Sequence, residues 1–136
     1  MTEFSFPIRV YYEDTDVAGL VYHANYLKFF ERARTEWLRE MDVDQTAMMA
    51  NDNIFAVSHI DIKYLKPARF NDQLRVVSQI SNCGFASVMF QQQLYRIDNP
   101  DVMLSSASVK VVNITLSTMT PCALDEALKE ELQRVI

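Results

Sequence analysis

The chain has 136 residues, of which 49% are hydrophobic and 23% are charged, and its formal net charge is −5. This length is enough for one domain with a sizeable core and too short for two, so we expect a single domain over residues 1–136. A negative charge without a cluster of basic residues argues against a nucleic-acid partner. No stretch approaches the ~20 apolar residues of a membrane span. The start, MTEFSF, lacks the apolar core of a signal peptide, so we expect a cytoplasmic protein.

The first predicted element is a strand over residues 8–13. Ile8, Val10 and Tyr12 alternate with more polar residues, which is the period of two typical of a half-buried strand. An acidic loop follows, and Gly19 within it allows a sharp turn and a close approach of the backbone to a ligand. The loop leads directly into a predicted helix, whose first backbone N–H groups lack partners and carry partial positive charge. This junction therefore suits an anion or a polarised carbonyl.

The spacing of apolar residues predicts a long helix over residues 25–41, with Asn25 as its N-cap. Burial of its aromatic stripe is expected to supply much of the core, at about 1.5 to 3 kcal/mol per large side chain. Arg34 falls inside the apolar arc, and we expect its side chain to reach out of the core and pair with Glu31. The apolar face itself consists of Tyr26, Phe29, Phe30, Ala33, Trp37 and Met41.

Strands dominate the rest of the chain, after a short loop or helical turn around residues 43–52. Spacings this short leave no room for crossover helices, so the sheet should be antiparallel. A last amphipathic segment carries Leu124, Leu128 and Leu132. The simplest arrangement is an α+β fold in which the long helix lies on one curled antiparallel sheet. Alternation predicts the strands at residues 55–64, 74–80, 88–94 and 103–116.

Two sequence motifs carry a family resemblance. The segment DTDVAGLVYHANY over residues 14–26, followed by FERARTE, resembles the hotdog-fold acyl-CoA thioesterases of the 4-hydroxybenzoyl-CoA thioesterase family. It most resembles the bacterial branch encoded with the Tol–Pal envelope system, and the similarity continues through KYLKPARFND at residues 63–72. The resemblance implies a curled five-stranded sheet wrapped around one long helix, and a homodimer or homotetramer that binds acyl-CoA between subunits. It implies no cofactor and no metal.

The resemblance places the catalytic carboxylate on Asp16 and a second catalytic position on His23. It also implies that a backbone N–H near His23 polarises the thioester carbonyl. An aspartate is ionised at neutral pH, so Asp16 is able to act as a nucleophile or as a general base, and both roles stay open. His23 could orient the substrate, help to activate water, protonate the departing CoA thiolate, or be structural. Substrate contacts are expected from Gly19, Val21, Tyr22, Asn25 and Arg69.

The sequence also allows functions other than a thioesterase. A non-catalytic module that binds acyl-CoA or acyl carrier protein would use the same pocket, and Arg69 with Lys66 would supply the positive charge for CoA phosphates or an acidic carrier protein. Those two residues could equally be solvated. The acidic loop resembles the start of a calcium loop, but Asn25 stands where a bidentate Glu is needed, so we expect no metal site. Peripheral association with the inner membrane would have to occur through partners, because nothing in the composition indicates it.

Overall fold

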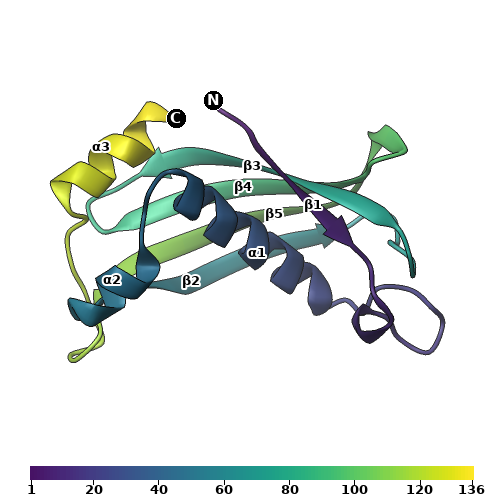
Figure 1. Ribbon diagram of the computed structural model, residues 1–136, viewed down its shortest axis with the longest axis horizontal. Coiled ribbons are helices and arrows are strands. Elements are labelled where there is room, and N and C mark those ends of the chain that lie inside the picture. The colour runs from purple at the N-terminus through teal and green to yellow at the C-terminus, as the bar shows by residue number, and fades with distance from the viewer.

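The computed structural model describes residues 1–136 and places one long helix, α1, in the hollow of a curled antiparallel sheet (Figure 1). Neighbouring strands follow the order β1-β3-β4-β5-β2, all pairs are antiparallel, and a short β6 pairs with β5. The predicted α+β hotdog architecture is confirmed. The strands are β1 (Phe4–Arg9), β2 (Asn53–Tyr64), β3 (Gln73–Cys83), β4 (Ser87–Arg96), β5 (Asn99–Thr115) and β6 (Thr120–Pro121). The helices are α1 (Asn25–Glu40), α2 (Gln45–Ala50) and α3 (Glu126–Arg134), with a 3₁₀ turn η1 at Tyr12–Asp14.

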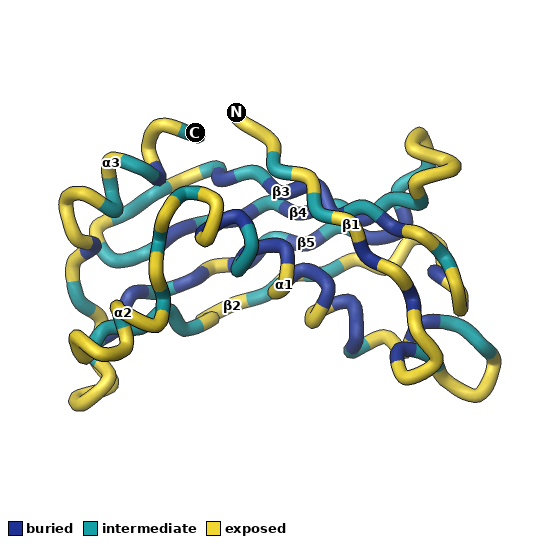
Figure 2. Tube along the Cα trace, in the orientation of Figure 1, coloured by how far each residue is buried: buried dark blue, intermediate teal, exposed yellow.

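The aromatic face of α1 is buried against the sheet, as the apolar spacing predicted (Figure 2). Phe29 and Phe30 are at most 1% exposed, and Trp37 is 3% exposed. The Trp37 ring stacks on Phe4 with centroids 5.8 Å apart and meets Phe90 edge to face at 6.2 Å. Trp37 therefore joins the edge strand β1, the helix and the central strand β4 in one packed layer. Met41, predicted on the same face, lies just beyond the helix and is half-buried.

Arg34 corrects one expectation about α1. Its side chain does not pair with Glu31 but is buried, at 7% exposure, and donates a 2.9 Å hydrogen bond from Nη1 to Oε1 of Gln92 on β4. Nε2 of Gln92 in turn donates to the Phe30 carbonyl and to the Ser78 hydroxyl, both at 2.9 Å. Because Arg34 lies in the arc that faces the sheet, its guanidinium donates to a side chain of the sheet and not to a neighbour on the helix surface. Desolvation by burial lowers the pKa of Arg34 from its ordinary value.

The first strand also differs from the prediction over residues 8–13. It begins earlier, at Phe4, and ends at Arg9, after which the chain turns through η1. The reason is local: the Tyr11 N–H donates to Oδ2 of Asp14 at 2.8 Å, and the Asp14 N–H donates to the Tyr11 carbonyl at 3.0 Å. These bonds compete with a strand ladder for the same backbone groups. The alternation beyond Arg9 was therefore not evidence of a strand.

The edge strand β2 runs beside α1 in the opposite direction (Figure 1). Its one partner strand is β5, so the outer edge of its twelve residues is open. A groove of about 110 Å³ separates β2 from α1. Apolar side chains line it, among them Leu38, Phe55, Val57 and Phe90, together with Arg34 and Glu31. No helix is both long and apolar enough to cross a membrane.

Candidate active site

The acidic loop folds as a tight hairpin that holds Asp16 at its tip. Thr15 and Val21 form an antiparallel bridge, and the Asp16 N–H donates to the Leu20 carbonyl at 2.8 Å. The Gly19 N–H donates to the Asp16 carbonyl at 3.1 Å, and Gly19 has φ of 75°, in the region that favours glycine. The predicted sharp turn at Gly19 is confirmed. The Asp16 side chain is exposed, and its Oδ1 accepts a 2.9 Å hydrogen bond from the Ala18 N–H.

Asp14, the first acid of the loop, is a structural residue. It is 6% exposed, and its carbonyl accepts two hydrogen bonds of 2.9 Å, from the Tyr22 N–H and from Nδ2 of Asn25. The predicted N-cap role of Asn25 is therefore wrong. The N-cap is Ala24, Asn25 is the first residue of α1, and its buried amide is committed to the Asp14 carbonyl. Asp14 and Asn25 together fix the loop to the start of the helix.

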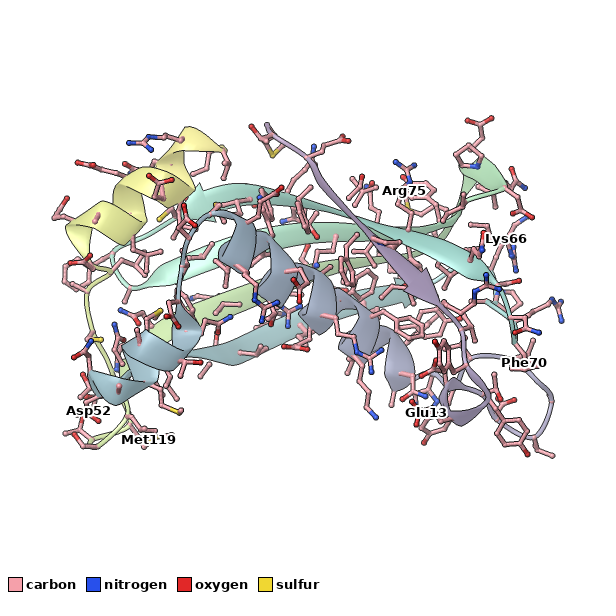
Figure 3. The ribbon with its side chains drawn as sticks, in the orientation of Figure 1. Glu13, Asp52, Lys66, Phe70, Arg75 and Met119 are labelled. Carbon is pink, nitrogen blue, oxygen red and sulfur yellow. The ribbon has the colours of Figure 1, made fainter.

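A second segment, residues 67–72, supports the loop from the other side. The Val21 N–H donates to the Ala68 carbonyl at 2.9 Å, and the Phe70 N–H donates to the Gly19 carbonyl at 3.0 Å. Arg69 pairs with Leu20 through a backbone bridge, which leaves its exposed side chain beside the loop. Figure 3 shows Phe70, Glu13 and Lys66 at this same end of the molecule. The two sequence motifs thus meet in space.

The entrance of α1 leaves hydrogen-bond donors free. Ala24 makes no side-chain cap, and the first turn of α1 contains no acidic residue. The backbone N–H groups of His23 and Ala24 donate to neither a carbonyl nor a side chain, although the next N–H, of Asn25, donates to the Tyr22 carbonyl at 2.8 Å. Free N–H groups at the positive end of a helix can stabilise a negatively charged oxygen.

The side chain of His23 is exposed between two tyrosines. Its ring centroid lies 4.5 Å from that of Tyr22 and 6.4 Å from that of Tyr64. Within one chain, no hydrogen bond or ion pair joins His23 to Asp16. The structure brings all the predicted site residues to one end of the fold, but Val21 and Asn25 are buried, whereas Asp16, Tyr22, His23 and Arg69 face outward.

Sequence reasoning missed two tyrosines that organise this end. The Tyr64 hydroxyl donates to the His23 carbonyl at 2.8 Å, and the Tyr26 hydroxyl accepts from the Ala68 N–H at 3.1 Å. The sequence pattern indicates only an ordinary strand position for Tyr64 and a position on the apolar face of the helix for Tyr26. The one available signal was the second motif, which contains Tyr64 and Ala68.

Comparison with known proteins agrees with this geometry. Residues 10–132 match the family model of the thioesterase-like superfamily. The chain is 44% identical to the acyl-CoA thioesterase YbgC of Haemophilus influenzae over 127 residues, or 93% of this chain and 91% of that protein. It is 40% identical to the acyl-CoA thioester hydrolase YbgC of Escherichia coli O6:H1 over 133 residues, or 98% of each protein. The DHNA-CoA thioesterase from Staphylococcus aureus has the same fold, with a TM-score of 0.93 at 20% identity, covering 99% of this chain and 91% of that one. The chain therefore belongs to the thioesterase-like superfamily of hotdog-fold proteins.

Proposed function

We propose that this protein is an acyl-CoA thioesterase, which hydrolyses an acyl-CoA to a free acid and CoA. The observation that carries the proposal is an exposed carboxylate, that of Asp16, on a hydrogen-bonded turn that leads into a helix entrance with unpartnered N–H groups. The YbgC relatives carry names that describe acyl-CoA thioester hydrolysis, which supports the same activity here.

The proposed reaction divides its work between the loop and the helix. Asp16 either takes a proton from the water that attacks the thioester carbonyl carbon, or attacks that carbon itself. On the second route an acyl anhydride forms on Asp16, and a water molecule then hydrolyses it to release the free acid and restore the carboxylate. The N–H groups of His23 and Ala24 bind the oxygen as it becomes negative, and loss of one such donor typically costs about 10²- to 10³-fold in kcat. The C–S bond then breaks, and the CoA sulfur leaves with the electron pair and takes up a proton. The exposed His23 ring would orient the thioester, assist water or deliver that proton.

We infer that the working unit is a homodimer, or a homotetramer built from such dimers. An edge strand of twelve residues with an open outer edge is a ready template for pairing with a second copy. Exposed apolar side chains lie along or just beyond this strand, with Val57 and Tyr64 at 47% and Leu65 at 54% exposure. Pairing along β2 would extend the sheet, cover these side chains and close the groove beside α1.

The same geometry suggests where the substrate lies. The exposed Arg69 guanidinium beside the loop suits the phosphates of CoA, with Tyr22 and the Gly19 turn near the thioester. The acyl group would enter the groove beside α1, which begins near Glu31, roughly 9 Å from Asn25 at about 1.5 Å of rise per helical residue. The family resemblance favours short- to medium-chain or aromatic acyl groups. We also propose that acyl carrier protein can present the acyl group in place of CoA. The proposed location is the cytoplasm, with partner proteins holding the enzyme near the inner membrane.

The test measures CoA thiol release by the wild-type protein and the Asp16→Asn variant with acyl-CoAs of graded length and with aromatic acyl-CoAs. We expect wild-type turnover and no turnover by Asp16→Asn, with unchanged thermal unfolding, because the exposed Asp16 side chain bonds only to a neighbouring turn N–H. Full activity in Asp16→Asn would refute its assigned role. Binding of acyl-CoA without release by the wild-type protein would indicate the alternative, a non-catalytic acyl-CoA or acyl-carrier-protein binding module.

A further inference from the structure

The start of α1 is held by a residue that belongs to neither the acidic loop nor the helix. Tyr64, the last residue of β2, donates a 2.8 Å hydrogen bond from its hydroxyl to the carbonyl oxygen of His23. No backbone N–H donates to this carbonyl, so the Tyr64 hydroxyl is its one donor in the chain. The Tyr64 ring packs edge to face against Tyr26, with centroids 5.2 Å apart, and is 47% exposed.

This hydrogen bond acts on the peptide unit that joins His23 to Ala24. The peptide group is planar and trans, so its C=O and its N–H point in opposite directions. Anchoring the His23 carbonyl therefore determines where the Ala24 N–H points. That N–H has no hydrogen-bond partner.

The preceding peptide unit is anchored in the same way by a different group. The Tyr22 carbonyl accepts a 2.8 Å hydrogen bond from the Asn25 N–H, which determines the direction of the His23 N–H, a further free donor. One donor is thus aimed by the backbone of the helix itself. The other is aimed by a side chain from a strand 41 residues further along the sequence.

We propose that Tyr64 is a positioning residue, which aims the Ala24 N–H at the thioester oxygen and so completes a two-donor oxyanion site. This inference rests on the proposed thioesterase function and extends it to a residue outside the loop and the helix. Tyr64 does not touch the reacting atoms in this role. Its hydroxyl restricts the rotation of one peptide unit, which would otherwise have to reorient as charge develops on the substrate oxygen.

The kinetic test compares Tyr64→Phe with the wild-type protein. The substitution removes one oxygen and keeps the ring that packs on Tyr26, so the fold and the thermal midpoint should be retained. We expect kcat to fall by about 10-fold or more with little change in KM, because an oxyanion donor contributes mainly in the transition state. The matched control is Tyr95→Phe, which removes a hydroxyl that donates to Oε1 of Gln93 on β4 and should leave both constants unchanged.

A spectroscopic test reports on the donor directly. The infrared stretch of the thioester carbonyl is measured for an acyl-CoA bound to Asp16→Asn and to the double variant Asp16→Asn/Tyr64→Phe. A well-aimed N–H polarises the carbonyl and lowers its stretching frequency, so the double variant should return the frequency toward that of free acyl-CoA. This measurement requires binding only, and it therefore decides the role of Tyr64 even if the protein turns over no substrate.

The outcomes separate this inference from the function on which it rests. Unchanged kcat and an unchanged carbonyl stretch in the Tyr64→Phe proteins would overturn the positioning role while leaving the thioesterase intact. A higher KM at constant kcat would also overturn it, because it would make Tyr64 an ordinary substrate contact. Binding without turnover by the wild-type protein would refute the thioesterase alone, whereas failure to bind any acyl-CoA would refute both.

Discussion

Gln92→Leu is expected to destabilise the protein strongly, because Gln92 is the one hydrogen-bond partner of the buried Arg34 side chain. The two side chains have similar volume, so the cost comes from polar groups left without partners. A lost hydrogen bond to a charged group costs about 1.5 to 3 kcal/mol, and a stranded neutral group such as the Ser78 hydroxyl adds about 1 kcal/mol. Since Arg34 also lines the groove, where water reaches part of it, we expect a total near 3 kcal/mol.

The same substitution should cost much less when the charge is absent. In an Arg34→Met background, Gln92→Leu strands only the neutral groups, so its cost should fall to about 1 kcal/mol. The coupling between the two positions is then about 2 kcal/mol, a value typical of side chains in one buried network. The two costs differ because most of the lost stability comes from leaving a buried charge unpaired, and less comes from losing a hydrogen bond between neutral groups.

Denaturant unfolding of the four proteins of the cycle, at one protein concentration, measures these free energies from the midpoints. Gln91→Leu is the matched control, because it is the same substitution on the preceding residue of β4. The half-exposed Gln91 side chain lies on the opposite face, where it hydrogen-bonds to the neutral hydroxyls of Ser81 and Ser108 and water can replace these bonds. We expect it to cost under about 1 kcal/mol. Equal costs for Gln92→Leu in the two backgrounds would refute the reasoning, because they would show that Arg34 does not depend on Gln92.

Two further predictions concern the core and the pH dependence of stability. Trp37→Ala should lower the unfolding free energy by about 3 to 5 kcal/mol, because the buried ring packs on Phe4 and Phe90 and its removal leaves a cavity between them. A loss below about 1 kcal/mol, measured by denaturant unfolding, would contradict this packing. Burial raises the pKa of the Tyr26 phenol above its ordinary value of 10.0, so the folded state favours the neutral phenol. The contribution of this preference to the unfolding free energy is complete below pH 10 and is lost as the pH rises through the pKa of the folded state. The unfolding free energy should therefore decline above pH 10, and less steeply in Tyr26→Phe, whereas identical pH profiles for the two proteins would count against a buried neutral phenol.

The sequence by itself determined the elements whose residues repeat with a regular period. The aromatic stripe of α1 and the alternation of β2 to β5 identify a helix and four strands, because burial against a single layer imposes one period on each element. The motif over residues 14–26 likewise located the loop, the glycine turn and the helix entrance, since these features depend on residues close together in the chain.

Only the tertiary structure decided the partners of the polar side chains. Arg34 bonds to a residue 58 positions away, and Tyr64 bonds to a carbonyl 41 positions away, so no local pattern contains either pair. Asparagine is favoured at N-caps, yet the side-chain amide of Asn25 donates to the Asp14 carbonyl instead. A period reports which face of an element is buried, whereas a hydrogen bond depends on which groups the fold brings within about 3 Å of each other. The Tyr64 bond to the His23 carbonyl, which anchors the peptide unit that carries the Ala24 N–H, belongs to this second kind of information.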